Sequence, residues 1–72
     1  MRRTWTIHCH PGRCYWECVT EIVGSDPHIV RSEEFSNRTE ATLNAQHHGL
    51  DPDNPDHVIV RKNYESKGPG SN

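Results

Sequence analysis

Hydrophobic and polar residues alternate in two neighbouring segments near the start of the chain. Residues 4–9 and 14–20 both show this alternation, and the segment between them, residues 10–13, has Pro11 second and Gly12 third. These positions favour a type II turn, because proline presets φ and glycine accepts a positive φ. The two segments are therefore predicted to form a β-hairpin.

The alternation also predicts the register of this hairpin and the content of its two faces. A slip of one residue would send either strand's apolar set to the wrong face, so the two patterns support one pairing, in which Cys9 lies opposite Cys14. One face is then expected to carry the core residues Trp5, Ile7, Cys9, Cys14, Trp16 and Cys18. The other face is left uncovered in a two-layer fold, so it is either an interaction surface or simply a face in contact with solvent. Its residues are Thr4, Thr6, His8, Tyr15, Glu17 and Val19.

The remaining pattern predicts two more strands and one helix. A turn at residues 24–27 precedes a short apolar strand at residues 28–31, and the β-prone triplet Val58-Ile59-Val60 indicates a strand over residues 57–64. Between them, a helix is expected over about residues 38–48. Asn37 and Glu40 fit a capping box at the start of this helix, and Gly49 fits a glycine stop at its end. Leu50 is placed to contact the turn around Ala45 as in a Schellman motif.

These elements predict one α+β domain over residues 1–64. The expected order is strand, strand, strand, helix, strand, with an antiparallel sheet of three to four strands and one helix packed on one face. Residues 65–72 have little to bury and are predicted to form a disordered C-terminal tail.

The chain resembles the small bacterial domains of unknown function called YegP-like. The resemblance rests on residues 15–19 and 29–35: an aromatic-rich strand, a second strand ending in Ser32-Glu33-x-Phe35, and a helix with the early Ala41. It implies a compact sheet-and-helix fold and brings no catalytic motif. The chain departs from that pattern in its long loop at residues 51–56, its Cys and His content and its single copy.

Size and composition narrow the function classes. A chain of 72 residues with 31% hydrophobic residues has a small core, since a domain of this size buries only about 60% of its unfolded surface, and a large catalytic cleft is not expected. No apolar stretch is long enough for a membrane span, and Arg2 and Arg3 are not followed by the apolar region of an export signal. We therefore expect a cytoplasmic protein that is not in a membrane.

The formal charge of −2 is unevenly distributed. Residues 1–16 have a net charge of +3, residues 17–56 carry nine acids against two arginines, and residues 57–72 are net positive. The acidic middle favours a basic partner, and the lack of a long basic run makes direct phosphate binding an unfavoured alternative. A nucleic-acid role remains open in two forms: an acidic mimic, or a weak sheet-face binder that uses Tyr15, Arg2 and Arg3.

The first hairpin also concentrates Cys and His. Cys9, Cys14 and Cys18 are interpreted first as small core hydrophobes, because their shared face predicts burial. A zinc-stabilised module is an alternative in which the fold brings His47 or His57 to the hairpin, or in which the loop residue His10 turns inward and His8 is left out. A cross-strand Cys9–Cys14 disulfide or redox role is a third.

No complete catalytic set can be assembled from the sequence. We therefore interpret the chain as a small non-enzymatic interaction module without a cofactor, which engages an unknown protein partner through its open sheet face or an edge strand. Unpaired sheet edges are compatible with a monomer or a homodimer.

Overall fold

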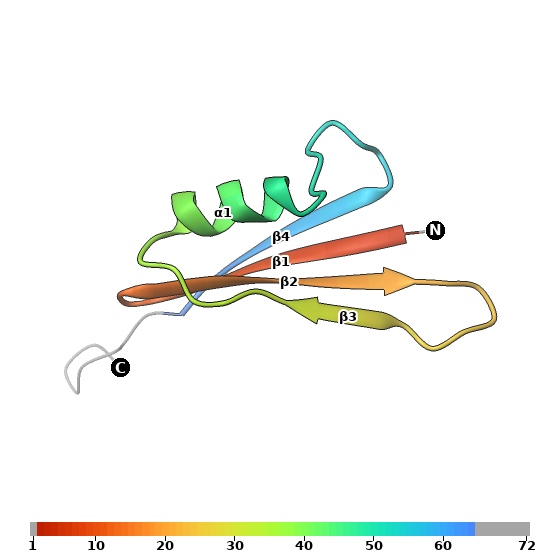
Figure 1. Cartoon of the computed structure of the whole chain (residues 1–72), viewed down its shortest axis with the longest axis horizontal. Coiled ribbons are helices and arrows are strands. Elements are labelled where there is room, and N and C mark those ends of the chain that lie inside the picture. The colour runs from red at the N-terminus through yellow and green to blue at the C-terminus, as the bar shows by residue number, and fades with distance from the viewer. Residues whose placement is uncertain (1, 65–72) are drawn as a thin grey trace.

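The computed structural model of the chain describes residues 2–64. The elements follow the order β1 (Arg2–His10), β2 (Arg13–Glu21), β3 (His28–Arg31), α1 (Arg38–His47) and β4 (His57–Asn63) (Figure 1). The predicted α+β class and the order of strands and helix are confirmed. The predicted tail at residues 65–72 lies outside the described residues.

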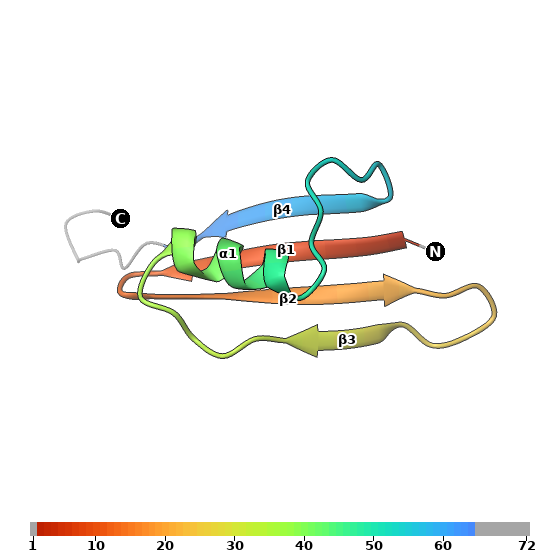
Figure 2. The same ribbon diagram turned by 45° about the horizontal axis from the view of Figure 1, so that its top comes forward.

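The four strands form one sheet in the order β3-β2-β1-β4 (Figure 2). The predicted hairpin register is confirmed: Cys9 pairs with Cys14, and Trp5 pairs with Cys18. Gly12 has φ +78° at the turn, a conformation that glycine adopts without steric cost. The turn residues and the two alternating patterns thus specify the same hairpin.

The sheet is mixed, which corrects the antiparallel arrangement expected for the fourth strand. β4 runs parallel to β1, whereas the β1–β2 and β2–β3 pairs are antiparallel. The cause is the helix. α1 carries the chain back to the end of the sheet where β3 began, so β4 starts at that end and runs in the same direction as β3 and β1 (Figure 1).

Both ends of α1 are capped as the sequence predicts. The side chain of Asn37 accepts a hydrogen bond from the Glu40 N–H at 2.9 Å. At the other end, the Leu50 N–H donates to the Ala45 carbonyl oxygen at 2.9 Å, and Gly49 has φ +117°, as a Schellman motif requires. The helix therefore stops at Gly49, and Leu50 turns back into the core.

The core lies between α1 and the strands β1 and β2. Five of the six side chains predicted for this face are buried, and Cys9 is partly buried. Trp16 also donates a hydrogen bond from Nε1 to Asn44 Oδ1 at 2.9 Å, which ties the helix to the sheet. The buried residues are Trp5, Ile7, Cys14, Trp16, Cys18, Ala41, Ala45 and Leu50.

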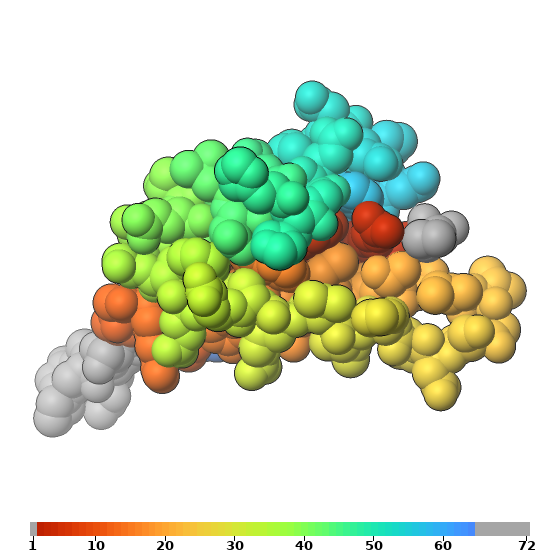
Figure 3. Space-filling model, viewed as in Figure 1, coloured from red at the N-terminus to blue at the C-terminus, as the bar shows by residue number. Residues whose placement is uncertain are grey.

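The helix covers only part of its face of the sheet. A helix of ten residues is about 15 Å long, whereas a strand of nine residues extends about 30 Å. α1 lies over the end of the sheet that holds the β1–β2 turn, and the opposite end projects beyond it (Figures 1 and 3). Within residues 2–64, no helix has the length and apolar content needed to cross a bilayer.

Candidate functional site

The uncovered end of the sheet carries most of the exposed aliphatic side chains. We call residues 20–31, which comprise the end of β2, the connecting loop and β3, the arm. Six large hydrophobic residues are exposed among residues 2–64, and four of them belong to the arm. Those four and their exposed fractions are Ile22 (43%), Val23 (102%), Ile29 (59%) and Val30 (44%). Their clustering on one projecting segment makes the arm a candidate contact surface.

An open cavity of about 380 Å³ lies where the arm leaves the helix. Trp5 and Trp16 line it from the core, and Ile22 and Val30 line it from the arm. This volume falls in the range of sites that bind small ligands or single side chains, roughly 300–1,000 Å³. The cavity lies where α1 ends, and the segment that follows α1 passes over β1 and β4 and not over β3 (Figure 1).

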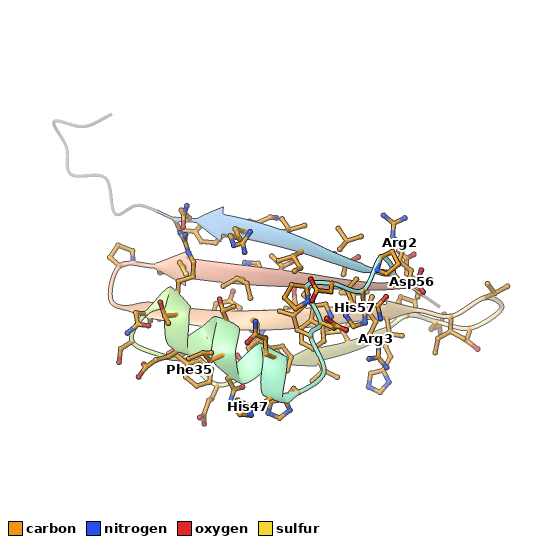
Figure 4. All side chains as sticks on the ribbon, turned by 90° about the horizontal axis from the view of Figure 1, so that it is seen from above. Arg2, Arg3, Phe35, His47, Asp56 and His57 are labelled. Carbon is orange, nitrogen blue, oxygen red and sulfur yellow. The ribbon has the colours of Figure 1, made fainter. Side chains whose placement is uncertain are left out.

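Three basic or titratable side chains complete the cavity wall: Arg3, His28 and His48. Figure 4 places Arg3 on the helix side of the sheet, close to His57 and Asp56. The Arg3 side chain forms no ion pair with any residue in the range 2–64. The wall therefore combines an apolar lining with a guanidinium group that has no carboxylate partner there.

Cys18 also lines this cavity, but its thiol is not suited to nucleophilic chemistry. Burial raises the pKa of the Cys18 thiol above its usual value, and the opposing effects of the Thr20 hydrogen bond and the Arg3 charge are smaller. The thiolate is the nucleophilic form, and Cys18 has no cysteine opposite to it, so its mostly protonated thiol is not poised for exchange near neutral pH. This agrees with its interpretation as a small core hydrophobe.

The backbone of β3 provides a second binding feature beside the cavity. β3 is an edge strand. The Ser32 N–H donates to the Trp16 carbonyl oxygen at 2.9 Å, so this residue faces β2. In an antiparallel strand, the N–H and C=O groups of every second residue point to the same side. Val30 is two residues before Ser32, so its N–H and C=O groups also face β2. Ile29 and Arg31 therefore turn their N–H and C=O groups to the free edge.

The six residues of the predicted interaction surface lie together on the open face of the sheet. Their placement follows from the pairing of His8 with Tyr15, Thr6 with Glu17, and Thr4 with Val19. All six are partly buried and none is fully exposed. Their part in an interaction stays a prediction.

Four rings and one guanidinium group are stacked across this open face. His8 stacks on Tyr15 with ring centroids 4.7 Å apart, and His10 stacks on Tyr64 at 4.4 Å. The guanidinium carbon of Arg31 lies 5.0 Å from the Tyr15 ring centroid. We call these five side chains the ring ladder. The rings of the ladder stack on one another, so few ring faces are free to stack on a nucleobase.

Polar contacts fix the ring ladder in place. His8 Nδ1 lies 3.0 Å from the Tyr64 hydroxyl, and His8 Nε2 lies 3.6 Å from Glu17. The same carboxylate group lies 3.6 Å from Arg31. Three of the six residues of the predicted surface, His8, Tyr15 and Glu17, thus contact the ring ladder or belong to it, whereas the arm has exposed apolar groups and an open edge.

The structure separates the Cys and His residues that the zinc alternative would combine. His8 and His10 lie on the open face with the ring ladder, whereas Cys9, Cys14 and Cys18 lie on the helix face. No three His, Cys, Asp or Glu side chains in residues 2–64 gather as a metal-ligand set. A tetrahedral zinc site has no complete set of ligands there.

Two acidic residues of the middle segment lie on different parts of the fold. Glu17 lies on the open face beside Arg31, and Glu40 lies in the first turn of α1. The open face is instead net basic by strand register, with Arg2, Arg13, Arg31 and Lys62 against Glu17 and Glu21. The expectation that the acidic middle favours a basic partner stays a prediction.

Comparison with known proteins provides no family for the chain. No family model matches it, and no curated protein or solved structure is significantly similar to it. The resemblance to YegP-like domains stays a prediction, and the candidate site rests on the geometry of the arm alone.

Proposed function

We propose that the protein is a non-enzymatic interaction module that binds an extended segment of another polypeptide by strand addition at β3. The observation that carries the proposal is the coincidence of a free strand edge with an uncovered apolar cavity. Among residues 2–64, no strand pairs with the outer side of β3, and Val30 of this strand lines the cavity. Backbone pairing supplies affinity in this mode of recognition, and pockets for alternate side chains supply specificity.

The chemistry of the bound segment follows from the two sides of the sheet. Alternate side chains of an added strand point to opposite faces. Those on the helix side would meet Trp16, Ile22 and Val30, which favours aliphatic or aromatic residues. Arg3 on the same wall favours a carboxylate group, because it has no acidic partner among residues 2–64. The segment is therefore apolar at alternate positions and carries an acidic residue.

The open-face alternatives are less well supported. A protein bound over the ring ladder would have to compete with contacts that already hold its members, such as His8 with Tyr15 and Arg31 with Glu17. A nucleic-acid binder needs free ring faces on which bases can stack, and the stacking within the ladder leaves few. Strand addition at β3 displaces no contact among the described residues.

The proposal can be tested with an array of short acetylated peptides. Apolar residues alternate with Ser or Thr in these peptides, with or without one Asp or Glu, and labelled protein is applied to the array. The wild-type chain is expected to be retained by a subset that carries an acidic residue. An N-methylated copy of each retained peptide, with the methyl groups on the paired edge, is expected to lose binding because it cannot donate the ladder hydrogen bonds.

Ile29→Pro and Ile29→Thr form a matched pair of variants. Proline at position 29 removes an N–H that faces the free edge, a position where a β-sheet tolerates proline, whereas threonine keeps this donor. We expect Ile29→Pro to weaken peptide binding by roughly tenfold or more, and Ile29→Thr to change it little. Equal binding by the two folded variants, or no retention of the wild-type chain by any peptide, would contradict strand addition at β3.

A further inference from the structure

Cys9 and Cys14 face each other at the end of the sheet opposite to the arm. They are directly paired in the hairpin, one position before the His10–Arg13 pair that closes the turn. Both side chains point to the helix face, and all three cysteines of the chain are free thiols. Cys18, in contrast, is paired with Trp5 and has no cysteine opposite to it.

The backbone places this pair at a site where the two strands come closest. Cys14 exchanges two hydrogen bonds with Phe35, at 2.7 and 2.6 Å, and the Cys9 carbonyl oxygen accepts one from Tyr64 at 2.7 Å. The peptide groups of both cysteines therefore point away from each other. In such a non-hydrogen-bonded pair the Cα atoms are about 4.5 Å apart, within the ~4.4–6.8 Å that a disulfide spans.

The two thiols differ in access. Cys14 is buried, at 4% exposed, whereas Cys9 is only partly buried. Burial, and then the neighbouring Cys9 thiol, raises the pKa of Cys14 to about 11, while the charge of Arg38 opposes this shift. Cys9 is thus the thiol that meets an external reagent first, and Cys14 is the one that follows.

We propose that Cys9 and Cys14 form a dithiol–disulfide site that exchanges with small disulfides of the glutathione disulfide class. Cys9 loses its proton to solvent and its sulfur attacks one sulfur of the small disulfide, which releases one thiolate and leaves a mixed disulfide. Cys14 is mostly protonated near neutral pH, so the second step is the slower one: Cys14 loses its proton to solvent and attacks the directly opposed Cys9 sulfur, which expels the second thiolate. The two protein thiols are oxidised to one disulfide, and the small disulfide is reduced to two thiols.

The bond formed in this way is readily reversed. The Cβ atoms of a directly opposed strand pair lie about 4.5–5.5 Å apart, with non-hydrogen-bonded pairs such as this one at the closer end, whereas a relaxed disulfide has about 3.8 Å. Oxidation must therefore draw the strands together next to the Pro11-Gly12 turn. A disulfide strained in this way is easier to reduce than a structural one, as a regulatory or exchanging site requires.

The test uses the full-length folded chain in glutathione buffers of graded oxidised-to-reduced ratio. Cleavage after Arg13 and after Glu17 puts the three cysteines on three separate peptides, so mass analysis identifies each linkage. We expect a Cys9–Cys14 disulfide to accumulate as the ratio rises, Cys18 to stay a thiol, and excess reduced glutathione to restore all three thiols.

Two variants separate the steps of the exchange. Cys14→Ser is expected to stop at a mixed disulfide on Cys9, and Cys9→Ser to leave the buried Cys14 a thiol. The disulfide linkages of the wild-type chain are identified without these variants. The main test therefore stands even if one of the variants does not fold. A disulfide that includes Cys18, a persistent mixed disulfide on wild-type Cys9, or no reaction before unfolding would overturn the proposal. Peptide binding at β3 is measured separately and does not depend on this result.

Discussion

The two ends of the sheet differ in how completely their side chains are engaged. At the end with the β1–β2 turn, α1 covers one face and the ring ladder occupies the other, so Cys14 is buried and His8, Tyr15 and Tyr64 contact one another. At the other end, the arm has neither cover, and Val23 is fully exposed. We expect the packed end to provide most of the stability, and the uncovered arm is the surface at which we propose that a partner binds.

The largest expected effect is at the packed end. Trp16→Ala removes a buried ring and its hydrogen bond to Asn44, and large-to-small changes of this kind cost about 3–5 kcal/mol. Small domains have total stabilities of about 5–15 kcal/mol, so we expect a severe loss of the free energy of unfolding. Urea denaturation followed by circular dichroism measures it. An unchanged midpoint would mean that the helix–sheet core does not hold the fold.

Alkaline pH is expected to weaken the same end. The folded-state pKa of Cys14 is about 11, against an ordinary value of 9.0, so folding favours the neutral thiol. This contribution to stability is complete below pH 9.0 and is lost as the pH rises through about 11. The free energy of unfolding of the reduced protein should decline less steeply over this window in Cys14→Ala than in the wild type. If the free energy of unfolding falls equally steeply with pH in both proteins, burial does not raise the pKa of the Cys14 thiol.

The smallest expected effect on stability is at the arm. Val23→Ser changes a fully exposed side chain, and surface substitutions of this kind usually alter the free energy of unfolding by less than about 0.5 kcal/mol. Parallel urea titrations of Val23→Ser and Trp16→Ala compare the two ends directly. A large loss in Val23→Ser would mean that the arm contributes to the core and is not a free surface.

Much of the packed end could be predicted from the sequence because its signals are local. Two alternating segments around Pro11-Gly12 specify the hairpin register, and Asn37 and Gly49 mark the two ends of the helix. Each of these signals depends on residues that are close together in the chain. They therefore identify an element without knowledge of the whole fold.

The direction of β4 and the exposure of the arm could not be predicted from such local sequence signals. The triplet Val58-Ile59-Val60 predicts a strand equally well in either direction, and its direction depends on where α1 delivers the chain. The arm is uncovered because α1 is shorter than β2, a comparison that appears only when the elements pack together. Its one sequence signal was the pair Ile22-Val23 ahead of Gly24, two apolar residues in a predicted connection.

Amide hydrogen exchange of the chain, followed by NMR with and without a peptide retained on the array, tests the account most directly. Strand addition predicts that the Ile29 and Arg31 amides, which face the free edge, gain protection when the peptide binds. The amide of Val30 faces β2 and serves as the internal reference. Protection that appears around His8 and Tyr15, with Ile29 and Arg31 still exchanging freely, would contradict binding at β3 and place the contact on the ring ladder.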